Sequence, residues 1–220
     1  MNQYQPSIAR TSGSVLATNK LIRNTYTLLS LTLLFSALTA GLSMVLHVGY
    51  GANLLAFVGS MALLWFVLPR TAHSAAGIGV VFAITGLLGF GLGPVLNQYL
   101  EMQNGSQTIM TALGGTGVIF LGLSAYALTT RKDFSFLGGM LFVGILVVLI
   151  ALIANIFLNI PAMSLGLSAV IIVLMSGFIL FDTSRIVNGG ETNYVLATVS
   201  LYLSIYNIFI NLLNILSARD

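Results

Sequence analysis

Asp182 is the residue of this chain whose chemistry depends most on its surroundings. It ends an apolar run in the stretch GFILFDTSRI, residues 177 to 186. A carboxylate among apolar side chains needs a partner, because burial of an unpaired charge is costly. Arg185 stands three residues later, within reach on one face of a helix, so an ion pair between the two is possible.

A second group of polar side chains lies near the end of the chain. Spacings of 4, 3, 4 and 3 place these side chains on one face of an otherwise apolar helix, and they are Ser200, Ser204, Asn207, Asn211 and Asn214. Two interpretations of this polar stripe stay open. It could supply hydrogen bonds between helices, at about 0.6 kcal/mol per contact, or it could line a conduit.

The composition places both groups in a membrane. Only 6% of the residues are charged, 57% are hydrophobic and the mean hydropathy is +1.01, whereas a soluble domain carries about 25% charged residues. A bilayer core takes about 20 apolar residues per helix. Apolar stretches occur at residues 21–47, 52–68, 74–99, 107–130, 134–158, 162–186 and 193–217. We therefore predict an all-α membrane protein with seven transmembrane helices.

The basic residues predict how these helices are oriented. Seven of the eight fall on one side of the predicted membrane, namely Arg10, Lys20, Arg23, Arg70, Arg131, Lys132 and Arg185, and only Arg219 falls on the other. The positive-inside rule then puts the N-terminus in the cytoplasm and the C-terminus in the periplasm. Residues 1–20 are polar and lack a helical period, so we predict a flexible cytoplasmic tail before one transmembrane domain at residues 21–220.

This orientation gives Asp182 a second possible partner. Asp182 lies about one turn, or about 5 Å, inside the cytoplasmic end of the 162–186 helix, and Arg70 follows the 52–68 helix on the same side. A pair with Arg185 would be an ordinary interfacial ion pair. A pair with Arg70 would join two helices as a latch at the cytoplasmic mouth. Both alternatives stay open.

Other residues favour helix packing over catalysis. Gly89 and Gly93 form a GxxxG pair, which lets two helices approach closely. His47 and His73 fall at helix ends on opposite sides of the membrane, and the chain has no cysteine. No pair of nucleophile and base is visible, so we predict neither an enzyme nor a metal or cofactor site.

Four segments resemble the Bax-inhibitor-1 family of seven-helix membrane proteins. FILFDTSRI and LYLSIYNIFINLL look like its paired signature, and TTRKDFSFLGGML and GGETNY are similar to its bacterial branch. The resemblance implies six helices around a central C-terminal helix. For the bacterial branch it implies an inner-membrane protein that associates with the membrane-anchored AAA protease FtsH and restrains its activity.

The resemblance also implies an alternative function, a pH-sensitive calcium leak. In that mechanism an acid on the sixth helix shares a proton with an acid on the seventh, and an arginine after the second helix closes the pore. Asp182 matches the first acid and Arg70 matches the arginine, but the second acid falls on Ser204. A carboxylate beside a hydroxyl lacks the coupled titration of two carboxylates. We therefore favour the protease modulator, itself a slow substrate engaged through its N-terminal tail.

Overall fold

The computed structural model describes residues 7–218, with side chains from residue 16 onward, and these residues contain helices and no strand. The helices are α1 (Ser7–Val45), α2 (Tyr50–Ala62), the π-helix η1 (Leu63–Val67), α3 (Leu68–Thr71), α4 (Ala76–Leu100), α5 (Gly105–Thr130), α6 (Leu137–Leu158), α7 (Pro161–Val187) and α8 (Tyr194–Ser217). The segments α2, η1 and α3 form one continuous span. Seven spans in the described residues are long and apolar enough to cross a membrane, which confirms the predicted number.

The helix ends follow from local chemistry. Pro161 begins α7, where its missing N–H is not needed. The side chain of Asn193 accepts hydrogen bonds from Val195 N at 2.8 Å and Leu196 N at 3.3 Å, so it caps the start of α8. At the C-terminal ends of α5 and α6, Arg131 and Asn159 adopt left-handed conformations, with φ of 50° and 49°, and these conformations terminate the two helices.

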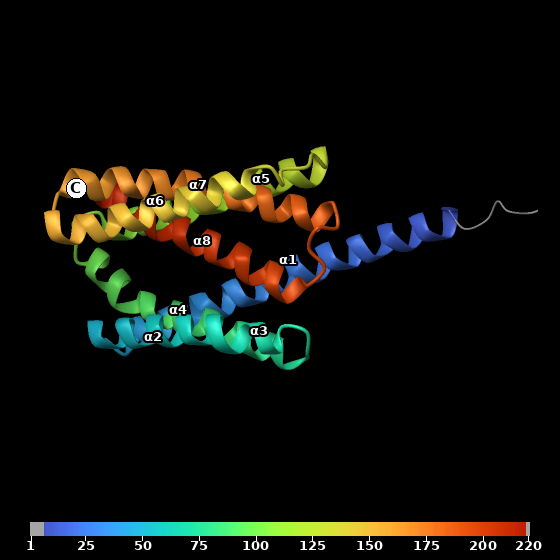
Figure 1. The fold of residues 1–220 in the computed structure, drawn as a ribbon. Helices are drawn as coiled ribbons and strands as arrows, with labels where there is room; N and C mark the ends of the chain where they lie inside the picture. The colour runs from blue at the N-terminus through green and yellow to red at the C-terminus, as the bar shows by residue number, and fades with distance from the viewer. Residues whose placement is uncertain (1–6, 219–220) are drawn as a thin grey trace, which may run out of the picture.

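The structure describes part of the predicted tail, and the flexibility of residues 1–20 stays a prediction. The structure draws residues 7–20 as the first turns of α1, which run beyond the ends of the other helices in Figure 1. Extending an existing helix adds one hydrogen bond per residue and needs no new nucleus, so the apolar segment that follows can support these turns. The prediction for residues 1–6 lies outside the described residues.

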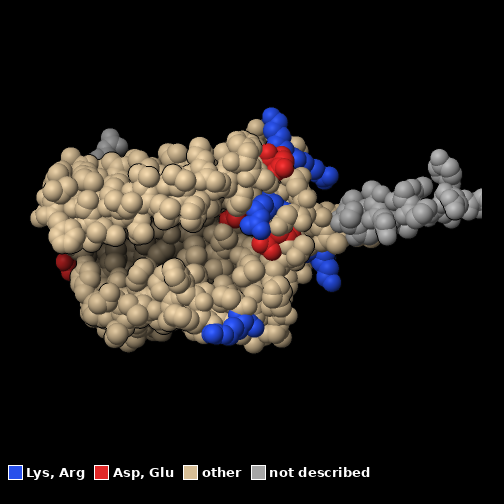
Figure 2. Space-filling view, viewed as in Figure 1, with Lys and Arg blue, Asp and Glu red and all other residues tan. Residues whose placement is uncertain are grey.

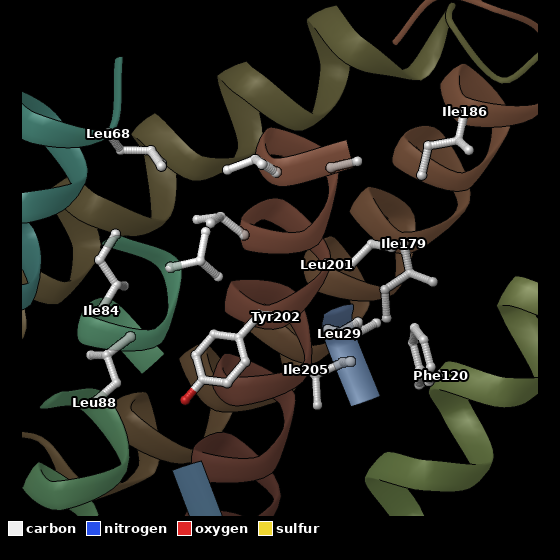
Figure 3. Close-up of a cluster of buried hydrophobic side chains, with 14 of the residues drawn as sticks. Leu29, Leu68, Ile84, Leu88, Phe120, Ile179, Ile186, Leu201, Tyr202 and Ile205 are labelled. Carbon is white, nitrogen blue, oxygen red and sulfur yellow. The ribbon is translucent and has the colours of Figure 1, made fainter. Parts of the chain in front are cut away.

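The last helix lies in the main hydrophobic cluster. Tyr202, Leu201 and Ile208 of α8 are at most 1% exposed, and they pack in this cluster with residues of α1, α4, α5 and α7 (Figure 3). Among the described residues, the backbone of α8 approaches α1, α4, α5 and α7, whereas α2 packs on α4 and α6 packs on α7. An arrangement with all six other helices around α8 therefore stays a prediction.

Close packing joins α1 to α4. A Cβ atom at Gly89 would overlap the carbonyl oxygen of Ser36, and one at Gly93 would overlap the side chain of Ser43. Both obstacles belong to the part of α1 that packs in the bundle. The GxxxG pair thus lies where two helix backbones come within a distance that only glycine permits.

We expect Gly89→Ala to destabilise the protein by about 1–3 kcal/mol, because the added methyl group must push α1 away from α4. Gly79→Ala on the same helix is the matched control, since nothing lies within 4 Å of its Cβ position. That change should be neutral or stabilise by up to about 1 kcal/mol, through helix propensity. Thermal unfolding in detergent measures both variants, and equal melting temperatures would contradict the packing role.

Candidate functional site at the α7–α8 contact

Asp182 is bound to α8 through a hydroxyl group. Its side chain is buried, with 7% exposed, and its Oδ2 accepts a hydrogen bond from Ser200 Oγ at 2.5 Å. A hydrogen bond to a charged acceptor is stronger than one between neutral groups, by roughly a factor of two. The carboxylate therefore contributes directly to the contact between α7 and α8. The predicted match for the second acid, Ser204, lies one turn further and donates to Ser200 O at 3.1 Å.

Neither of the ion pairs considered for Asp182 forms among the described residues. Arg185 instead pairs with Glu191 at 3.3 Å, and its guanidinium lies 5.5 Å from the centre of the Phe181 ring. The turn after α7 is short enough to bring Glu191 back beside Arg185. A half-buried pair near the surface contributes about 0–1 kcal/mol, so it positions the loop more than it stabilises the fold.

Arg70 is occupied by its own helix. Its Nη1 donates to Phe66 O at 2.6 Å, and the residue is exposed. The preceding Pro69 lacks an N–H, and its ring disturbs the helical hydrogen bonds of the turn before it, where the π-helix η1 occurs. The arginine side chain thus binds a carbonyl in a distorted turn. Among the described residues Arg70 forms no ion pair with Asp182, and a latch between the two stays a prediction.

A small polar cavity adjoins Asp182. It has a volume of about 190 Å³, and its lining includes Asp182, Arg185, Glu191 and Ser200. Two carboxylates and one guanidinium leave it with a net negative charge. In the described part of the chain there is no group of three or more His, Cys, Asp or Glu side chains that could hold a metal ion.

The polar stripe of α8 serves mainly α8 itself and α7. Asn207 Nδ2 donates to Leu203 O and Asn211 Nδ2 donates to Asn207 O, both at 2.8 Å within the helix. At the far end, Asn214 Nδ2 donates to Ser168 Oγ of α7 at 2.8 Å. The bonds of Ser200 and Asn214 therefore join α7 and α8 near both ends of the stripe. These two bonds are of the kind that the first interpretation describes, and the choice between the two interpretations of the stripe stays a prediction.

The loops at this end of the molecule bind to the same helix ends. Ser184 Oγ of α7 donates to Lys132 O at 3.0 Å and accepts from Phe134 N at 2.9 Å, and both partners belong to the α5–α6 loop. In the same loop, hydrogen bonds from Ser135 lower the pKa of Asp133. The segments TTRKDFSF and FDTSR, distant in sequence, thus meet at the end of α7.

The α7–α8 loop adds a third segment to this junction. Glu191 Oε1 accepts hydrogen bonds from the backbone N–H groups of Thr192 and Asn193, both at 2.9 Å. Asn193 Nδ2 donates to Ala72 O at 2.9 Å and lies 3.3 Å from His73 Nδ1. Asn193 therefore caps α8 and also holds the turn between α3 and α4. We name the contacts of Asp182, Ser184, Glu191, Asn193 and Ser200 the loop junction.

Sequence reasoning missed three members of the loop junction. Glu191 and Asn193 stood in the segment GGETNY, and Asn193 immediately precedes an apolar run, which is the usual signal of a helix cap. Ser184 had no signal, because its two partners in the α5–α6 loop lie about fifty residues away in the chain. The side chains of Lys and Arg also gather toward this end of the molecule (Figure 2), as their distribution along the chain predicted.

Comparison with known proteins assigns the chain to a family. The family model of the inhibitor of apoptosis-promoting Bax1 matches residues 18–220. The modulator of FtsH protease YccA of Escherichia coli strain K12 is 57% identical over 209 residues, which cover 94% of each chain. A second Escherichia coli strain has a protein, the inner membrane protein YccA, with the same identity and coverage.

A more distant relative covers even more of the chain. A membrane protein of Vibrio cholerae, without an assigned function, is 47% identical over 217 residues, or 98% of this chain and 97% of that protein. The matches include the segments that form the loop junction, because they span nearly the whole sequence. The family resemblance of those segments is confirmed, and this chain belongs to the Bax-inhibitor-1 family.

Proposed function

We propose that this protein is a bacterial inner-membrane protein that associates with the membrane-anchored AAA protease FtsH and restrains its activity. The observation that carries the proposal is the 57% identity, over 94% of both chains, to a protein named as a modulator of that protease. A regulatory role needs no catalytic group in this chain. Its physical requirement is a fold that the protease can engage and cannot quickly extract.

The contacts of α8 supply such resistance in our proposal. An ATP-driven protease that pulls on the N-terminal side must separate α1 from α4 and α8 before it reaches the rest of the bundle. Tyr202 Oη of α8 lies 2.6 Å from Ser36 Oγ of α1, and Thr198 Oγ1 donates to Thr25 O of α1 at 3.2 Å. Once separated, these groups find no other hydrogen-bond partners in the hydrocarbon of the bilayer, so each step of extraction costs free energy.

The N-terminal segment is the proposed point of engagement. The start of α1 is helical and projects beyond the bundle (Figure 1). An isolated helix of on the order of 12–15 residues is only marginally stable in water. Because residues 7–20 include Gly13 and several Ser and Thr residues, a protease could unwind them at low cost.

The orientation needed for this engagement follows from the basic residues. Arg131, Lys132 and Arg185 lie in or beside the loops of the loop junction, and α1 begins at the same end of the molecule (Figure 1). The positive-inside rule favours the cytoplasm for that end. An FtsH-type protease acting from the cytoplasm would engage the N-terminal residues first.

No observation favours the calcium leak over the modulator. The partner of Asp182 on α8 is a serine hydroxyl, and Ser204 bonds to its own helix. A divalent cation prefers several oxygen ligands, usually with more than one carboxylate. Glu191 is the second acid near Asp182, and it is already paired with Arg185.

Production of this chain in cells that contain the protease should lengthen the half-life of a membrane substrate of FtsH, because the enzyme is occupied. Pulse-chase labelling of that substrate measures the effect. The same experiment in cells without the protease is the control, where the half-life should not change. Unchanged turnover in protease-containing cells, although the chain is present in the membrane, would contradict the modulator.

Deletion of residues 2–15 should protect the protein from degradation and leave its seven spans folded, since Lys20 and Arg23 remain to set the orientation. We expect a longer half-life than that of the full chain when the protease is present. In protease-deficient cells the two half-lives should agree. Equal half-lives in both strains would exclude the N-terminal segment as the point of engagement.

The substitution Asp182→Asn distinguishes the modulator function from the calcium-leak function. The amide can still accept a hydrogen bond from Ser200, so we expect a loss of stability of about 1 kcal/mol, the difference between charged and neutral hydrogen bonds. Calcium flux into liposomes should stay at background across pH 5 to 8 for both proteins. Ser200→Asp is the informative counterpart, because it would place two carboxylates in contact and create a coupled titration. A calcium flux in the unmodified protein that Asp182→Asn abolishes would support the leak.

A further inference from the structure

A cleft lies between α1 and α5, on a floor formed by α4 and α8. Its volume is about 460 Å³. Within the described residues the backbones of α1 and α5 do not come into contact, so the cleft is open between them. We propose that it is a binding site for one acyl chain of a membrane phospholipid.

The position of the cleft decides which medium it meets. All four helices around it belong to membrane spans. Most lining residues of α1, α4 and α5 lie in the halves of these helices away from the loop junction, such as Met44, Leu96 and Ile109. None of the lining residues is charged. The mouth therefore faces bilayer hydrocarbon, whose uncharged chains match the uncharged walls.

Water is a poor occupant because the hydroxyl groups of the lining are already bonded. Ser36 and Tyr202 bond to each other at 2.6 Å, and Tyr206 Oη donates to Leu88 O at 3.4 Å. Thr116 Oγ1 donates to Ala112 O at 2.7 Å. A buried water needs two to four polar partners, and these walls leave few unused.

A transmembrane helix is too large to enter. A helix about 10 Å wide that crosses about 30 Å of hydrocarbon occupies roughly 2,000 Å³. The cleft has about 460 Å³, and the empty space up to and including its open side is about 1170 Å³. A single acyl chain is thin and flexible, and it fits such a space without displacing the walls.

Small residues on both walls leave the cleft unfilled. Ala37 and Gly41 line the cleft from α1, and Gly117 lines it from α5. A Cβ atom at Gly41 or Gly117 would meet no atom within 4 Å. These glycines therefore do not serve close helix contact, unlike Gly89, and their absent side chains leave the volume that the acyl chain takes.

Native mass spectrometry after mild detergent extraction tests the site, with retained phospholipid per protein as the readout. The unmodified protein should keep one phospholipid through stepwise removal of lipid. Gly117→Leu should fill the cleft from one wall and lower retention by about tenfold, which corresponds to 1.4 kcal/mol. Gly41→Leu should do the same from the opposite wall, so that the test does not depend on one variant.

Gly122→Leu is the matched control. Gly122 lies on the same helix as Gly117, is exposed, has free space around its Cβ position and is not part of the cleft. This variant should retain lipid like the unmodified protein. Equal retention in Gly117→Leu, Gly41→Leu and Gly122→Leu would overturn the proposal, and so would an unmodified protein that retains no lipid or is isolated with a second copy in place of the lipid.

Discussion

The structure depends on one constraint, which is that hydrocarbon offers no hydrogen bonds to the polar side chains of α8. Each of these side chains must find its partner inside the protein. Asn207 and Asn211 use their own helix, Ser200 and Asn214 use α7, and Tyr202 uses α1 and α4. The tyrosine and the stripe act on different faces of α8. Together they permit only one rotation of this helix within the bundle.

The loop junction extends this logic to the end of the molecule where water is near. Side chains there bind mostly to backbone atoms of other segments, as Ser184 binds the α5–α6 loop and Asn193 binds the α3–α4 turn. Such bonds position loops without requiring buried charge. Asp182 is the exception, because it is buried and yet bound to a neutral donor. Its burial is tolerable because it lies near the helix end, where a charge costs less than at the membrane centre.

Much of the fold was predictable, because the bilayer restricts the choices. Length and hydropathy were enough for seven spans, since apolar segments in lipid must be helical. The partner of Asp182 was harder to predict. Ser204 and Ser200 differ by one turn on the same face of α8, and the relative height of two helices decides which of them meets the carboxylate. The partner of Arg70 was also hard to predict. Pro69 disturbs the preceding turn, and this turn offers the carbonyl oxygen of Phe66 to the arginine.

The serine opposite Asp182 connects this geometry to function. Two acids in contact would repel each other when ionised and would loosen α7 from α8 as the pH rises. A serine and an ionised acid attract each other, so in the same position they hold the helices together. A leak gains from a contact that opens, whereas a protein that resists extraction by a protease gains from one that stays closed. The hydrogen bond between Ser200 and Asp182 is of the second kind, and Asn214 adds a similar bond to the same helix near the opposite end of α8.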